Sequence, residues 1–218
     1  MLTCAVGLAL RYMYGPGSEG LFKPKWDFMS LTLVGLGICS FLFHASLRQS
    51  LEFADELSML GLTWSMIHST YTTGQTQSRS RLIAAALTAF HLPFAAFYIW
   101  SPRIVYQVTA FSAALILVGL RTQYLVHGPN AVFPKGVARD WTVRSLKATA
   151  ISMTGYLLWN IENMYCAELR VLKAQVGLPW AWLLEFHGWW HVLTAIGASK
   201  YMDVAREIKA EVGRRKQE

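Results

Sequence analysis

The sequence has few charged residues and few cysteines, and each shortage excludes a class of protein. Asp, Glu, Lys and Arg make up 15% of the 218 residues, whereas hydrophobic residues make up 54%. Soluble domains usually carry about 25% charged residues, so this composition predicts a membrane protein. The three cysteines are too few and too dispersed for a disulfide framework. Basic residues form no stripe with interleaved aromatics, so we expect no nucleic-acid partner.

Long apolar runs are what the chain does have. A helix that crosses about 30 Å of hydrocarbon needs about 20 mainly apolar residues. This criterion predicts six spans, at residues 28–47, 57–78, 82–102, 104–120, 148–161 and 176–199. Residues 1–14 lack the basic region and cleavage site of a signal peptide, and they predict the second half of a first helix whose beginning is missing. We therefore expect an all-α polytopic membrane helix bundle, with six full spans plus a partial first helix.

The distribution of basic residues predicts the orientation, because cytoplasmic loops retain Lys and Arg. If the C-terminus is cytosolic, only four of the 20 Lys and Arg residues lie on the opposite side, namely Arg48, Arg103, Arg170 and Lys173. We interpret the net charge of +7 as topology and as attraction to anionic lipid headgroups. We expect one transmembrane domain at 1–202 and a basic cytosolic tail at 203–218, with no internal repeat.

Five polar side chains fall at one depth of the predicted bundle, in its lumenal half. Ser40 and His44 lie near the end of one span, Asp55 lies just before the next, and His187 and His191 lie on the last. Residues four apart share a helix face, and ionisable residues at membrane depth usually mark a functional site. Three imidazoles plus water form a usual catalytic zinc shell. The pattern therefore predicts a zinc site.

Each of these residues also has a simpler interpretation. Two histidines four apart in a helix occur often by chance. Ser40 is a small residue suited to helix packing or to bonding its own helix, and Asp55 is suited to the positive end of a helix dipole. Their convergence at one depth favours the metal site. The other histidines have no second ligand at helical spacing and are interpreted as packed or interfacial residues: His68, His91 and His127.

Four stretches carry a specific combination of residues: GICSFLFHASLR at 37–48, ADELSM at 54–59, LWNIEN at 158–163 and FHGWWHVLT at 186–194. This combination resembles the alkaline ceramidase family. That family belongs to a wider group of seven-helix intramembrane hydrolases that includes the adiponectin receptors. The resemblance runs from the first residues to about residue 201, and it implies a seven-helix architecture for this chain.

The resemblance implies a role for each residue of the cluster. His44, His187 and His191 match the family's zinc ligands, and Ser40 and Asp55 match the partners of the catalytic water and substrate. The implied reaction is hydrolysis of the amide of a ceramide, or of its phyto- or dihydro- form, to a sphingoid base and a free fatty acid. Asp55 is then the candidate proton shuttle, and Ser40 is the candidate donor to the oxyanion.

Other expectations concern the surroundings of the site. Trp190, Asn160 and Glu162 are candidate supporting residues, although an interfacial belt and a polar helix end explain the last two equally well. Glu185 lies two residues from His187, so we expect it on the opposite face, toward the interface. The family's acidic segment and first-helix Glu that hold calcium are missing from this sequence, so we expect no calcium site.

The resemblance also implies the cellular setting and leaves two alternatives. We expect an integral membrane protein of the endoplasmic reticulum or Golgi whose partners are a ceramide-type lipid and the bilayer, with no obligate protein partner. A non-catalytic or receptor-type relative would keep the zinc, but it would need an extended recognition segment, and the loops are short. A transporter or proton relay would also put His and Asp in the membrane, but spread through its full depth.

Overall fold

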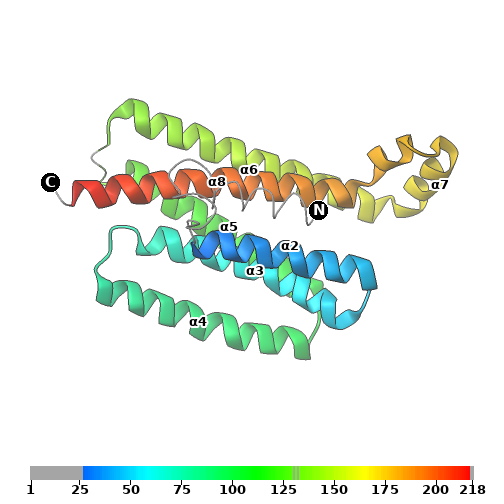
Figure 1. Ribbon diagram of the computed structural model, residues 1–218, viewed down its shortest axis with the longest axis horizontal. Helices are drawn as coiled ribbons and strands as arrows, with labels where there is room; N and C mark the ends of the chain where they lie inside the picture. The colour runs from blue at the N-terminus through cyan, green and yellow to red at the C-terminus, as the bar shows by residue number, and fades with distance from the viewer. Residues whose placement is uncertain (1–26, 130, 132, 217–218) are drawn as a thin grey trace, which may run out of the picture.

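A computed structural model describes residues 27–129, 131 and 133–216 of the 218-residue chain. Every regular element in these residues is a helix, as predicted (Figure 1). The elements are α2 (Phe28–Ser46), α3 (Gln49–Thr72), α4 (Gln77–Trp100), α5 (Ile104–His127), α6 (Lys135–Met164), α7 (Cys166–Val176), the short 3₁₀ helix η1 (Trp180–Leu184) and α8 (Phe186–Arg215). The partial first helix predicted at 1–14 lies outside the described residues.

The long helices form a bundle in which two helix pairs are joined by α5. Helices α6 and α8 lie side by side, and α2 packs along α3, with α4 on the outer side of α3 (Figure 1). Helix α5 contacts α3, α6 and α8. Helix α7 and η1 contact each other and project from one end of the α6–α8 pair (Figure 1). The start of α8 therefore lies at the end of the bundle that carries α7.

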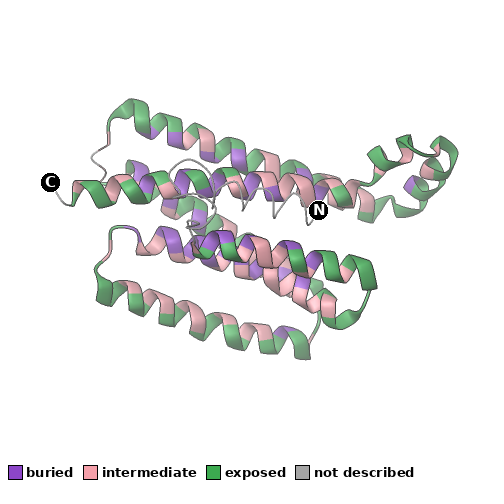
Figure 2. Ribbon diagram, viewed as in Figure 1, coloured by how far each residue is buried: buried purple, intermediate pink, exposed green. Residues whose placement is uncertain are grey.

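The outer surface of the bundle is apolar, as a lipid environment requires. Of the described helices, α2, α4 and α5 are long and apolar enough to cross a membrane. Helices α3, α6 and α8 have 24, 30 and 30 residues, which also exceeds the length of a span. Helix α4 has Tyr98 as its one buried residue, although the helix is predominantly apolar (Figure 2). The protein is thus an integral membrane helix bundle.

Several helices are longer than the apolar runs that predicted them. Helix α3 begins at Gln49 instead of residue 57, α6 begins at Lys135 instead of residue 148, and α8 continues to Arg215. Hydropathy marks only the part of a helix that lies in hydrocarbon, whereas backbone hydrogen bonding continues through the charged ends. The domain boundary drawn between residues 202 and 203 falls inside α8.

The run at 176–199 is not one helix, so this predicted span is wrong in its first half. Helix α7 ends at Val176, and Gly177 takes a left-handed φ of 68°. Pro179 precedes η1, and α8 begins only at Phe186. A glycine and a proline so close together end a helix, which the apolar composition of the run conceals.

Small residues bring α6 and α8 close together. A Cβ added to Gly197 of α8 would meet the carbonyl oxygen of Ala148 at 2.8 Å, and one added to Gly155 of α6 would meet Leu193 Cβ at 3.1 Å. Small residues allow backbones to approach in this way in membrane bundles. The direction of α8, which carries two of the predicted site histidines, is therefore set by its contact with α6.

An ion pair joins the start of α2 to α8, at the end of the bundle opposite α7. Asp27 caps α2 by accepting a hydrogen bond from the Ser30 N–H at 2.6 Å, and Arg206 Nε donates to Asp27 Oδ2, also at 2.6 Å. Burial opposes ionisation of Asp27, but the hydrogen bonds from Arg206 and Ser30 outweigh burial and hold its pKa below the ordinary value. The two helices that carry the predicted site histidines are thus connected at this end.

Candidate metal centre

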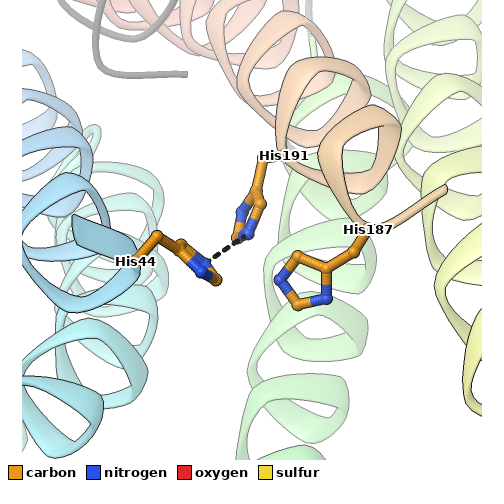
Figure 3. A group of neighbouring side chains, drawn as sticks. All are labelled: His44, His187 and His191. Carbon is orange, nitrogen blue, oxygen red and sulfur yellow. Dashed lines mark hydrogen bonds between the residues drawn. The ribbon is translucent and has the colours of Figure 1, made fainter. Parts of the chain in front are cut away.

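Three histidines meet at the end of the bundle near α7. His44 lies in the last turn of α2, and His187 and His191 lie in the first two turns of α8, four residues apart and on one face. Figure 3 shows the three imidazole rings around a common space. The ring centroids of His44 and His187, and those of His44 and His191, lie 5.1 Å apart, and the third pair lies 4.6 Å apart.

The arrangement fits a metal ion. One ligand atom from each histidine lies within 4.8 Å of the other two, and His44 Nε2 and His191 Nε2 are 3.1 Å apart. Two nitrogens on one tetrahedral zinc would lie about 3.4 Å apart. His187 Nε2 is buried and has no hydrogen-bond partner among the described residues. A buried polar atom without a partner raises the free energy of a protein, and a bound cation would supply the missing partner.

Ser40 and Asp55 form a buried pair beside the histidines. Ser40 lies one turn before His44 on α2, and Asp55 lies in the second turn of α3. Ser40 Oγ donates to Asp55 Oδ2 at 3.2 Å, and the same carboxylate oxygen is 3.9 Å from His44 Nε2. Asp55 Oδ1 is buried without a hydrogen-bond partner in the described part of the chain. A carboxylate with one free oxygen thus borders the histidine cluster.

An open cavity of about 700 Å³ gives access to the histidines. Its lining includes Ser40, His44, Glu162, Glu185, His187 and His191. His191 also lines a space of about 30 Å³ between α2, α3 and α8. An apolar cavity of about 160 Å³ lies between α3, α5, α6 and α8. Leu62, Trp190 and Thr194 line both inner spaces.

The structure brings Glu162 to the first turn of α8. Glu162 Oε2 accepts a hydrogen bond from the backbone N–H of His187 at 2.5 Å, and its Oε1 accepts one from Lys173 Nζ at 2.9 Å. Lys173 also pairs with Glu185 at 3.0 Å. Partial burial opposes protonation of Lys173, but its hydrogen bonds to Glu162 and Glu185 outweigh burial and raise its pKa.

Two sequence interpretations change as a result. Glu185 was expected on the face opposite His187, but it precedes α8 and turns toward the cavity, because helical spacing does not apply before the helix begins. Lys173 was counted only as a lumenal charge. Its partner Glu162 is eleven residues away, and a continuous helix would hold the two residues about 16 Å apart along its axis. They meet because the chain turns between α6 and α7, which the sequence did not indicate.

The other two candidate supporting residues have different surroundings. Trp190 is buried and packs against Tyr156 and Trp159 of α6, with ring centroids 6.0 and 6.2 Å apart. It therefore fixes α8 against α6 next to His191. The Asn160 side chain donates to the carbonyl of Tyr156, four residues earlier in the same helix, and this contact does not connect it to the histidines.

Comparison with known proteins points to one family. The Ceramidase family model matches residues 3–218. Alkaline ceramidase 3 of Mus musculus is 27% identical over 174 residues, which cover 78% of this chain and 61% of the mouse protein. Alkaline ceramidase YPC1 of Saccharomyces cerevisiae is 28% identical over 188 residues, which cover 78% of this chain and 57% of the yeast protein. The chain thus spans about three fifths of the length of these curated relatives.

Proposed function

This chain belongs to the Ceramidase family, and from that premise we propose that it is an intramembrane zinc-dependent amidase. The proposed reaction is hydrolysis of a ceramide, or of a phyto- or dihydroceramide, to a sphingoid base and a free fatty acid. One observation supports it most: the imidazoles of His44, His187 and His191 converge from two helices beside the buried Asp55 carboxylate. Both relatives are named as alkaline ceramidases, which agrees with this reaction.

The chemistry divides between the bound metal and the residues of the chain. Zinc held by three imidazoles lowers the pKa of a bound water toward neutral pH and polarises a carbonyl oxygen. Asp55 accepts a proton from the attacking water as the water oxygen bonds to the carbonyl carbon. It then returns this proton to the nitrogen, and the C–N bond breaks to release the amine. Ser40 Oγ donates to Asp55 before the reaction. Once Asp55 holds the proton, the protonated carboxyl donates to Ser40 Oγ, and the Ser40 hydroxyl turns to donate to the oxygen of the amide as negative charge develops there.

A lipid substrate is supported by the setting of the site. Removing an acyl chain from the bilayer would cost about 0.8 kcal/mol per CH₂ group, so an enzyme for a two-chain lipid gains from a site within the membrane. The apolar cavity of about 160 Å³ behind Trp190 is suited to part of one chain. We propose that ceramide enters laterally and that its amide reaches the histidines through the open cavity.

The orientation and location belong to the same proposal. Arg48 and Arg103 lie in connections at the histidine end of the bundle, and Arg170 and Lys173 lie in α7 at the same end. The other described basic residues lie in α4, α5, α6 and α8, away from that end of each helix, or at Lys216. The positive-inside rule then makes the C-terminus cytosolic and the site lumenal. We propose the endoplasmic reticulum or Golgi as the compartment.

Fatty-acid release and zinc content, measured on the same samples, test the proposal. Detergent-purified wild type should release fatty acid from a fluorescent ceramide at alkaline pH and contain about one zinc per chain. His187→Ala should lose both. His127→Ala is the matched control, because His127 of α5 forms a hydrogen bond with Thr142 of α6 and not with α2, α3 or α8. Zinc without turnover would favour a non-catalytic or receptor-type protein, and a wild type without zinc would favour a transporter or proton relay.

A further inference from the structure

The first turn of α8 receives a hydrogen-bond acceptor from another helix. The first N–H groups of a helix have no partner within it, and the Glu185 side chain, at the N-cap position, does not cap α8. The carboxylate of Glu162, on α6, accepts the N–H of His187 instead. This hydrogen bond acts directly on the backbone of a proposed zinc ligand.

Lys173 holds that carboxylate in place. Its Nζ lies 2.9 Å from Glu162 Oε1 and 3.0 Å from Glu185 Oε2, and only 18% of its side chain is exposed. Its two partners come from α6 and from the residue that precedes α8, while Lys173 itself belongs to α7. One ammonium group therefore connects three elements at the edge of the site cavity.

Without this ammonium group, two carboxylates would border the same cavity with no cation between them. Like charges repel, and the exposed side of the cavity offers water to both groups. Glu162 would then be free to leave the His187 N–H and turn toward water. The start of α8 would lose its cap, and His187 would lose its fixed backbone position relative to His44.

We propose that Lys173 is a positioning residue: it keeps Glu162 on the His187 N–H and so holds His187 and His191 where they share one metal ion with His44. The proposal rests on the zinc site of the proposed function. Residues that orient metal ligands commonly change metal affinity about 10- to 100-fold when they are replaced. The effect of Lys173 should therefore appear in zinc affinity itself, before any effect on turnover is considered.

Zinc affinity of the purified protein, measured by competition with a chromogenic chelator, tests the proposal. Lys173→Met keeps the length of the side chain and should weaken zinc binding at least about tenfold. Lys173→Arg can still bridge both carboxylates and should stay within about threefold of wild type. Arg170→Met is the matched control: it removes the same charge from the same helix, and Arg170 contacts Cys166.

A double variant separates a specific effect from a general loss of structure. If Lys173 acts through Glu162, Lys173→Met should add less than about threefold to the loss caused by Glu162→Gln alone, since effects within one network are not additive. Fully additive losses, or equal zinc affinity in Lys173→Met and Arg170→Met, would overturn the role of Lys173 and leave the zinc site intact. Absence of zinc from wild type would overturn both proposals.

Discussion

Asp55 is the residue on which the proposed chemistry depends most. Its Oδ2 accepts a hydrogen bond from Ser40. Its Oδ1 is buried without a hydrogen-bond partner among the described residues. Asp55→Asn keeps the size of the side chain but removes its ability to take a proton. Because general acid–base catalysis typically contributes about 10²- to 10⁴-fold, turnover should fall by that factor. Zinc content should stay at the wild-type level, since Asp55 is not a ligand in the proposal. Loss of zinc together with turnover would contradict this assignment.

Ser40 is expected to act on the developing charge of the amide. Ser40→Ala should lower kcat about 10²- to 10³-fold, the usual effect of removing one oxyanion donor. Ser46→Ala is the control on the same helix, because the Ser46 hydroxyl donates to the Leu42 carbonyl and accepts the Arg48 N–H, and neither partner belongs to the histidine cluster. Initial rates at saturating ceramide distinguish the two variants. Equal rates for Ser40→Ala and wild type would remove Ser40 from the mechanism.

At the scale of elements, the close contact between α6 and α8 controls the position of two histidines. Gly197→Ala would push a methyl group to 2.8 Å from the Ala148 carbonyl oxygen. Overpacking of this kind costs about 1–3 kcal/mol, so the melting temperature in detergent should fall, and turnover should fall with it. Gly213→Ala is the control: it lies in the same helix, and a Cβ there meets no atom within 4 Å. Its melting temperature should be unchanged or slightly raised. Equal destabilisation by both variants would contradict this account of the contact.

The ion pair between Asp27 and Arg206 predicts a pH dependence of stability. Asparagine caps a helix as well as aspartate, so Asp27→Asn removes mainly the charge. The pKa of Asp27 is held below its ordinary value, so its contribution is fully present above about pH 4 and is lost as the pH falls through the folded-state pKa. Thermal unfolding should show Asp27→Asn less stable than wild type from alkaline pH down to about pH 5.

Below about pH 4 the difference between wild type and Asp27→Asn should shrink, because wild-type Asp27 becomes protonated. Asp203→Asn is the control: Asp203 also pairs with Arg206, but about half of its side chain is exposed, and exposed pairs contribute little. A difference that grows as the pH falls would contradict this explanation.

The sequence predicted those features of the site that follow from helical spacing. Ser40 with His44, and His187 with His191, each lie four apart, and the apolar runs around them predicted helices that the structure contains. The alternation of spans across the membrane then predicted that the five polar residues would share one depth. The distances between side chains of different helices required the structure.

Features that depend on breaks in the helices were missed. The contact of Lys173 with Glu162 and Glu185 depends on how the chain turns between α6 and α8, where Gly177 takes a left-handed conformation. Hydropathy assigned the second part of this segment, from residue 176 onward, to a span. The early start of α3 was missed for the opposite reason: the charged residues Glu52, Asp55 and Glu56 interrupt the apolar pattern without interrupting the helix.

At the scale of the whole molecule, the bundle turns apolar side chains outward and collects polar groups at one end. Helix α4 exposes most of its apolar residues (Figure 2), a surface that lipid covers favourably. The histidines, Ser40 and Asp55 lie together at the end that carries α7 (Figure 1). This position agrees with the proposed substrate, a ceramide that reaches the site through the membrane.

X-ray absorption at the zinc edge, recorded on the purified protein, tests directly whether His44, His187 and His191 bind zinc. We expect about one zinc per chain, with three imidazole nitrogens at about 2.0–2.1 Å and one oxygen ligand. His44→Ala should lose the metal or one of the three nitrogens. A zinc bound through sulfur, or a spectrum with three imidazoles that is unchanged in His44→Ala, would contradict the assignment of His44, His187 and His191 as the metal centre.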